Sequence, residues 1–212
     1  MRKVIVAAVS VVALALSASM ATAALVPNVY DPGNTNCPVS TYSNGVLHLA
    51  KNCPTPTNAA AQATITGFTG ATFTSASFTL ASTSQCNGGS PRFNVYTNAQ
   101  QPPFFLGCNN VIPVVDPTTG AATYTFNAAT IAAAGGQVPV PTGTISFVEI
   151  VLDVQGSADL RNITFNGVLQ VPATLAAKAA CKKGGWKTFT SPKFKNQGQC
   201  IKYVNAHRHA QS

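Results

Sequence analysis

The chain has 212 residues, a formal net charge of +8 and only 8% charged residues. Because five residues in all are acidic, few side chains could supply the paired carboxylates that glycoside hydrolysis requires. The charge is also uneven, since all five acids and three bases lie in residues 24–172, whereas residues 173–212 hold eight bases and no acid. This asymmetry predicts a domain over residues 24–171, a basic module over residues 172–212, and different partners for the two.

The first 23 residues have the layout of a secretory signal peptide. Arg2 and Lys3 precede an apolar run, and small residues then lead up to Ala23, where cleavage is expected. The alternative is a membrane anchor, but that needs roughly 20 apolar residues and this run is shorter. We therefore expect a protein that is secreted or associated with the cell surface, with no transmembrane segment after cleavage.

Six cysteines follow this leader, and an exported chain favours disulfide bonds among them. Many pairings are possible, so sequence cannot prove one. The cysteines nevertheless cluster in three local pairs, and we favour Cys37 with Cys53, Cys86 with Cys108, and Cys181 with Cys200. A zinc site is the alternative, but no Cys-x-x-Cys pair occurs and the histidines lie far from the first four cysteines, so we expect no metal and no cofactor.

Residues 60–170 are rich in Thr, Ser, Val, Phe and Ile, with Gly, Pro and Asn at short intervals. A short helix is possible at residues 127–136, where alanines precede a glycine pair. Strands are expected, in chain order, at residues 63–68, 75–82, 92–97, 104–108, 123–128, 144–155 and 159–167. Several short strands separated by turn residues predict an all-β fold, an antiparallel β-sandwich of the jelly-roll kind, and about 150 residues suffice for one core.

The strand expected at residues 144–155 provides the best test for an enzyme. Glu149 and Asp153 lie on one face of it because side chains alternate along a strand. The same face is expected to carry Ile145, Phe147 and Val151. The two carboxylates would stand roughly 13 Å apart, beyond the roughly 5–9.5 Å of catalytic pairs, so hydrolysis would need a partner from another strand.

Other catalytic signatures are also absent from the sequence. There is no G-x-S-x-G elbow, and His48 stands in an alternating segment where a structural or surface histidine is the ordinary case. Residues 86–93, Cys-Asn-Gly-Gly-Ser-Pro-Arg-Phe, lack the spacing of a phosphate-binding loop and suit a turn inside a disulfide loop. We therefore assign no catalytic residue, and whether the protein is an enzyme stays open.

Residues 84–97, followed by the Gly-Cys end of residues 104–108, resemble a group of secreted bacterial proteins of unknown function that carry a Cys-Gly-Gly-Ser-Pro-Arg-Phe turn. Residues 152–167 resemble the closing strands of carbohydrate-binding jelly rolls, with Arg161 where those usually have an acid. These resemblances imply a fold more than a ligand.

Sugar-binding faces combine aromatic rings with neighbouring polar groups. The body contains no tryptophan, so tyrosine would have to supply a stacking platform, with Phe104 and Phe105 as further rings. Alternatively the phenylalanines form the core and the tyrosines its rim. The candidate ligand-binding residues are Arg92, Asn94, Tyr96, Asn98 and Tyr124.

The C-terminal part contains the pattern Cys-Lys-x-Gly-Gly-Trp, then Phe, then Phe-Lys-Asn-Gln-Gly-Gln-Cys and a Tyr-Val pair. The positions that fill it are Cys181, Lys182, Gly184, Gly185, Trp186, Phe189, Phe194, Lys195, Asn196, Gln197, Gly198, Gln199, Cys200, Tyr203 and Val204. About 25 residues therefore closely resemble a short C-terminal module found on many otherwise unrelated secreted bacterial proteins. The resemblance implies export and modularity and leaves the role of the module open.

Two interpretations of this basic module are compatible. So short a segment needs a staple to fold, so its aromatic residues would form a small core locked by a disulfide. Its lysines would then form a cationic surface for wall polymers or lipid headgroups, whereas nucleic acid is not expected outside the cell. The candidate polyanion-contacting residues are Lys182, Lys183, Lys187, Lys193, Lys195 and Lys202.

The sequence therefore predicts an exported, non-catalytic binding or surface protein. Its β-sandwich is a candidate for recognising an extracellular polysaccharide, and its lysine-rich tail for contacting an anionic envelope or matrix polymer. Two alternatives stay open: a small polysaccharide-cleaving enzyme on a jelly-roll fold, using Glu149 or Asp153, and a purely structural extracellular protein.

Overall fold

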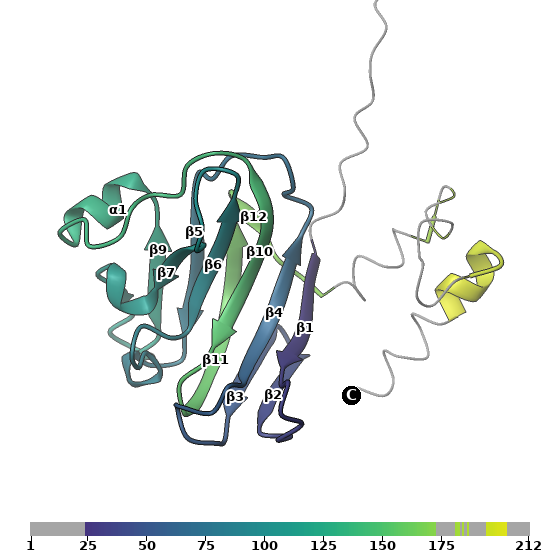
Figure 1. Cartoon of the computed structure of the whole chain (residues 1–212), viewed down its shortest axis with the longest axis horizontal. Coiled ribbons are helices and arrows are strands. Elements are labelled where there is room, and N and C mark those ends of the chain that lie inside the picture. The colour runs from purple at the N-terminus through teal and green to yellow at the C-terminus, as the bar shows by residue number, and fades with distance from the viewer. Residues whose placement is uncertain (1–23, 173–180, 183, 185, 187–193, 203–212) are drawn as a thin grey trace, which may run out of the picture.

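The computed structural model describes residues 24–172, 181, 182, 184, 186 and 194–202 (Figure 1). The predicted signal peptide, residues 1–23, lies outside the described residues. Among the residues that are described, no helix is long and apolar enough to cross a membrane.

Residues 24–172 form two antiparallel sheets that pack face to face (Figure 1). The first, which we call the front sheet, has five strands with β10 at its centre. Its strands, in spatial order, are β1 (Ala24–Tyr30), β4 (Ala60–Thr66), β10 (Ile145–Leu152), β6 (Arg92–Thr97) and β7 (Phe104–Gly107).

The second sheet, which we call the back sheet, supplies the other wall of the sandwich. Its strands, in spatial order, are β2 (Pro38–Ser43), β3 (Val46–Lys51), β11 (Gly156–Phe165), β5 (Ala76–Leu80), β9 (Ala122–Phe126) and β8 (Val114–Val115), and β12 (Val168–Leu169) pairs with β11. The chain repeatedly crosses between the sheets, as from β3 to β4, β5 to β6 and β10 to β11. The predicted antiparallel β-sandwich is confirmed, while its jelly-roll assignment stays a prediction.

Each of the seven strands expected beyond residue 60 is present, with its ends shifted by a few residues. The helical alternative is also present as α1 (Ala128–Ala133), which joins β9 to β10. It begins after Asn127, whose side chain accepts a hydrogen bond from the Thr130 backbone N–H at 2.9 Å. This N-cap satisfies a backbone donor that the first turn leaves unpaired, so a short local sequence is enough to start the helix.

Three strands before residue 60 were not predicted. β2 and β3 form a hairpin through Asn44 and Gly45, whose φ angles are 49° and 80°. An Asn-Gly pair is the strongest short-range signal for such a turn because both positions need positive φ. That signal was present in the sequence and would have located this hairpin.

The core is formed by the side chains that the two sheets turn toward each other. Phe93, on β6 of the front sheet, is fully buried, and its ring meets three phenylalanine rings of the back sheet. The centroid distances are 5.6 Å to Phe78, 5.9 Å to Phe126 and 6.0 Å to Phe165. Burial of each such ring stabilises the fold by about 1.5–3 kcal/mol, so these rings hold the two sheets together.

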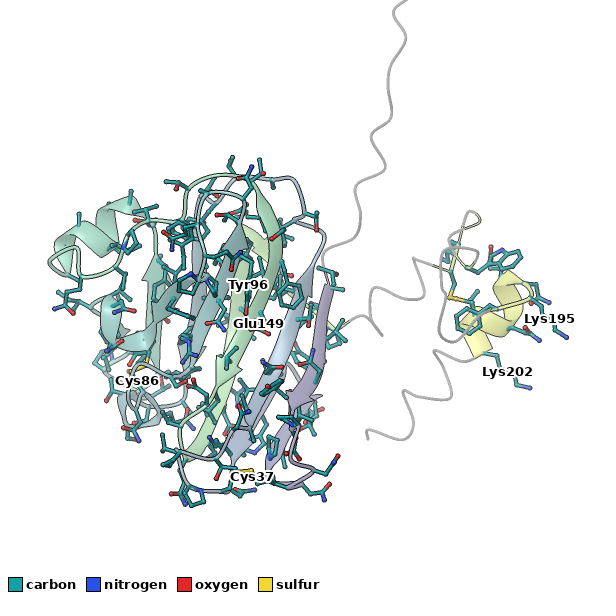
Figure 2. The ribbon with its side chains drawn as sticks, viewed as in Figure 1. Cys37, Cys86, Tyr96, Glu149, Lys195 and Lys202 are labelled. Atoms are coloured by element: carbon teal, nitrogen blue, oxygen red, sulfur yellow. A yellow bond between two sulfur atoms is a disulfide. The ribbon has the colours of Figure 1, made fainter. Side chains whose placement is uncertain are left out.

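The structure contains all three disulfides that the spacing favoured (Figure 2). One joins the residue before β2 to the segment after β3, and another joins the turn before β6 to the residue after β7. The pairs are Cys37–Cys53, Cys86–Cys108 and Cys181–Cys200. Closing loops of this length contributes about 3 kcal/mol each by restricting the unfolded chain.

The sandwich extends one residue past the predicted boundary. The Leu25 backbone N–H donates to the Val171 carbonyl at 2.8 Å, and Pro172 is buried and forms a bridge with Leu25. The first and last described residues of the body are therefore held side by side, and a truncation that preserves this contact should end at Pro172.

Candidate functional site

The outer face of the front sheet gathers polar side chains around its central strand. Along β10, Val148, Ile150 and Leu152 point into the core, so Glu149 points outward. Glu149 lies opposite Asn94 on β6 and Thr64 on β4. Polar residues from three strands are thus brought together by register alone, because neighbours across a sheet share a face.

One neighbour predicted for Glu149 is placed differently. Ile145 was expected on its face, but a β-bulge between Ile145 and Phe147 shifts the alternation. Ile145 is buried in the core, whereas Phe147 points outward and is 40% exposed. Bulges re-aim side chains in this way, and alternation read from sequence cannot locate them.

At the end of β10, Asp153 and Arg92 form a bidentate ion pair. Arg92 donates from both terminal nitrogens to the two oxygens of Asp153 at 2.7 Å each, and the Ser90 hydroxyl donates to Oδ1 at 2.8 Å. The Arg92 guanidinium carbon also lies 5.1 Å from the centroid of the Phe105 ring. Two parallel hydrogen bonds and a ring contact fix the orientation of this arginine.

Arg92 continues the hydrogen bonding toward the middle of the sheet. Its Nε donates to Asn94 Oδ1 at 2.9 Å, which leaves the Asn94 amide to donate to Glu149 Oε1, also at 2.9 Å. The Tyr96 hydroxyl donates to the same Glu149 oxygen at 3.3 Å. We call Asp153, Arg92, Asn94, Glu149 and Tyr96 the polar network; Figure 2 shows Tyr96 and Glu149 close together on adjacent strands.

The environment of Asp153 makes it a poor proton donor. Burial raises its pKa, but the hydrogen bonds and charge of Arg92, together with the Ser90 hydroxyl, more than offset this effect. The pKa of Asp153 therefore lies below its ordinary value, and the group is anionic at neutral pH. A general acid needs the opposite shift.

Glu149 is in a different situation. Its side chain is only 8% exposed, yet its second oxygen, Oε2, accepts no hydrogen bond from the described residues. The described residues also place no cationic group within salt-bridge distance of it. Burial raises the pKa of the neighbouring Tyr96 phenol, and the charge and hydrogen bond of Glu149 raise it further. Tyr96 is therefore a neutral donor at neutral pH.

Aromatic rings border the polar network. Tyr96 and Phe147 pack edge to face, with their ring centroids 5.4 Å apart. Phe105 is 42% exposed on β7, and Tyr30 is 47% exposed at the end of β1. Exposed rings beside hydrogen-bonding groups give this face both apolar and polar contact surface.

Two hollows lie along β10, one on either side of Glu149. The larger, of about 360 Å³, is lined by residues that include Tyr30, Gln62, Arg92 and Asp153. The smaller, of about 200 Å³, lies between β4 and β10 and is lined by Thr64 and Phe147 among others. Phe147 and Asp153 are six positions apart, so the face spans roughly 20 Å along the strand, which suits an elongated ligand.

Lys51 shapes the wall of the larger hollow. It is 1% exposed, and its Nζ donates to the carbonyls of Thr55, Thr57 and Asp153 at 2.7–2.8 Å. All three ammonium hydrogens are therefore used, and the residue ties the loop after β3 to the turn after β10. Sequence reasoning missed this role because the third carbonyl, that of Asp153, lies 102 residues away in the chain.

The five predicted ligand-binding residues lie in three different places in the structure. It brings Arg92, Asn94 and Tyr96 together in the polar network. Asn98 lies beyond the end of β6, where its Oδ1 accepts from the Thr144 backbone N–H at 2.8 Å and so holds a loop. Tyr124 was the wrong choice, because it is 2% exposed and its ring lies 5.5 Å from that of Phe78 in the core.

The two phenylalanines proposed as further stacking rings differ in their exposure to solvent. Phe104 is buried in the core, whereas Phe105 is exposed beside Arg92. On the back sheet, His48 Nδ1 lies 2.7 Å from Asp159 in a half-exposed cross-strand pair, as expected for a surface histidine. Within the described residues, no group of three or more His, Cys, Asp or Glu side chains could hold a metal ion.

The described part of the C-terminal module has a small core of its own. Cys181, Phe194 and Cys200 are buried, and Trp186 and Ile201 pack against them. Residues 197–202 form a short helix, at whose start Asn196 Oδ1 accepts from the Gln199 backbone N–H at 2.8 Å. The aromatic core predicted for this module is thus present for Trp186 and Phe194.

Three of the six predicted polyanion-contacting lysines are described. Lys182, Lys195 and Lys202 are exposed, and Figure 2 labels the last two. The other three, Lys183, Lys187 and Lys193, lie outside the described residues, as do Phe189 and Tyr203.

Comparisons with protein-family models, curated proteins and solved structures gave no match for this chain. We therefore infer the function from the geometry of the site.

Proposed function

We propose that the protein is an exported, non-catalytic carbohydrate-binding protein whose recognition surface is the outer face of the front sheet. The observation that carries the proposal is the polar network with exposed rings on its border. The network presents an open carboxylate oxygen at Glu149, and Phe147, against Tyr96, and Phe105, against Arg92, expose their rings on its border.

A sugar ring has hydroxyl groups around its edge and apolar C–H groups on its faces. Glu149 Oε2 can accept hydrogen bonds from hydroxyls, while Tyr96, Phe147 and Phe105 offer surfaces for the apolar faces. The length of the face and its two hollows suit a chain of sugars better than a single ring. The low pKa of Asp153 and its ion pair with Arg92 favour binding over proton transfer.

Export is supported by two independent features. The layout of residues 1–23 is that of a cleavable leader, and the chain forms three disulfides with no described free cysteine. Disulfides of this kind persist in oxidising compartments. The partner we expect is therefore an extracellular or envelope polysaccharide.

The binding face can be tested with the oxidised mature protein and a panel of insoluble polysaccharides. High salt is used to suppress electrostatic binding by the basic module. In a Tyr96→Ala/Phe147→Ala variant, we expect binding to fall about tenfold or more, since each ring contact contributes about 0.5–1.5 kcal/mol. The control is Val114→Ala, which truncates a 76% exposed side chain on β8 of the back sheet. Equal binding by the ring variant, the control and the wild type would contradict the proposal.

For the C-terminal module we propose contact with anionic envelope or matrix polymers. Its described lysines Lys182, Lys195 and Lys202 are exposed, and residues 173–212 contain no acid. Binding of this kind weakens as salt screens the charges. Replacing these three lysines by glutamine should reduce sedimentation with bacterial walls at low salt and leave high-salt binding to polysaccharide unchanged. Undiminished wall binding by this variant at low salt would contradict the assignment.

A further inference from the structure

Glu149 differs from every other acid of the chain in what surrounds its charge. Asp31 accepts from the backbone N–H groups of Thr35 and Asn36, and Asp116 from those of Thr118 and Thr119. Asp153 pairs with Arg92 and Asp159 with His48. Among the described residues, Glu149 has only a side-chain amide and a phenol as donors, both directed to one oxygen.

One oxygen of Glu149 is left open by its surroundings. The residue is nine-tenths buried, and no cation lies within salt-bridge distance of it among the described residues. Arg92, in the same polar network, directs its described hydrogen bonds to Asp153 and Asn94. Oε2 is not among the buried atoms that lack a partner, so it is open to solvent. A ligand that brings a positive charge to this oxygen would form a charge-assisted hydrogen bond with it.

The rings beside Glu149 favour the same kind of group. Tyr96 donates to Glu149 and packs against Phe147, so this aromatic pair lies next to the carboxylate. The faces of aromatic rings attract cations. The body as a whole adds to this preference, since residues 24–172 carry five acids and three bases.

We propose, building on the carbohydrate-binding function above, that the ligand is a polysaccharide of amino sugars with free, protonated amino groups. One sugar ammonium donates to Glu149 Oε2 and lies against the Tyr96 and Phe147 rings. Neighbouring sugars along the chain extend toward the hollows on either side. The N-acetylated form of the same polymer lacks the charge and binds more weakly.

The test compares a short β-1,4-linked glucosamine oligomer with its fully N-acetylated counterpart. Each is titrated calorimetrically into the oxidised mature protein at about pH 6. Added salt screens the repulsion between the lysines of the basic module and the cationic oligomer. It weakens the partly buried ion pair between the sugar ammonium and Glu149 less. We expect the free-amine oligomer to bind at least tenfold more tightly than the acetylated one.

Two variants with the same change of charge make the comparison specific. Glu149→Gln retains the size and an acceptor oxygen, and should abolish the preference for the free amine. Asp159→Asn, on the opposite sheet, should leave it intact. Equal affinity of wild type for the two oligomers, or a preference that survives in Glu149→Gln, would overturn the inference.

The same titrations separate this inference from the proposed function. If neither oligomer binds but the wild type sediments with a neutral polysaccharide in a manner that depends on Tyr96 and Phe147, the amino-sugar inference is wrong and the binding face stands. If no polysaccharide binds at all, both proposals fail.

Discussion

The sandwich and the C-terminal module reach stability by different means. The sandwich buries a continuous cluster in which Phe78, Phe93, Phe126 and Phe165 join two sheets. The described core of the module consists of a disulfide, Phe194, and the partly buried Trp186 and Ile201. The charges also differ, because the five acids all belong to the sandwich and residues 173–212 hold eight bases. A large core can tolerate the loss of a staple, whereas a small one depends on it.

The largest difference is expected when each part loses a disulfide. Replacing Cys181 and Cys200 by serine should unfold the module, while replacing Cys86 and Cys108 should lower the stability of the sandwich by about 2–5 kcal/mol and leave it folded. The chain has one tryptophan, Trp186, so tryptophan fluorescence reports on the module and far-ultraviolet circular dichroism reports mainly on the sandwich. A cooperative fluorescence transition that persists without the Cys181–Cys200 bond would contradict the account.

A second change should affect only the sandwich. Lys51→Met leaves the carbonyls of Thr55, Thr57 and Asp153 without their shared donor, and we expect the free energy of unfolding to fall by about 3 kcal/mol. The matched control is Lys195→Met at an exposed position, which should change stability by about 0.5 kcal/mol or less. Equal denaturation midpoints for the two variants would show that the ammonium does not hold the loop.

A smaller effect is expected at Asp153. Because its pKa is lowered in the folded state, the unfolded chain binds more protons in acid, so this contribution is present above about pH 4 and is lost as pH falls through the folded pKa. Asp153→Asn should cost about 1–2 kcal/mol at pH 7, since the carboxylate is partly exposed. The difference from wild type should shrink as pH falls below about 4, which denaturant titrations at several pH values would measure. A difference that stays constant down to about pH 2 would contradict the assignment.

The strands beyond residue 60 could be predicted because their composition and turn residues are local signals. Arg92, Asn94 and Tyr96 could likewise be grouped, since they alternate along one strand. Alternation does not say which face is the core, however, and for this reason Tyr124 was wrongly placed on a binding surface. Whether a strand turns a tyrosine inward depends on how the two sheets pack, which no local pattern reveals.

The least predictable features depend on contacts between distant segments. Lys51 is buried because the carbonyl of Asp153, 102 residues away, meets it beside two loop carbonyls. Glu149 attracted attention as a catalytic candidate, but its isolation from cations became visible only once β6 and β10 were paired. Ile145 left its predicted face because of a bulge. In each case the sequence shows the chemistry of the side chain but not which residues surround it in the fold.

We propose that the sandwich recognises a polysaccharide while the basic module binds polyanions. The most direct measurement is co-sedimentation of the oxidised mature protein, and of a version ending at Pro172, with bacterial walls and a polysaccharide panel at low and high salt. We expect the shortened protein to keep a salt-resistant affinity for one polysaccharide and to lose the salt-sensitive affinity for walls. If the shortened protein is folded by circular dichroism yet binds no polysaccharide at any salt concentration, the front sheet is not the recognition surface and the account is wrong.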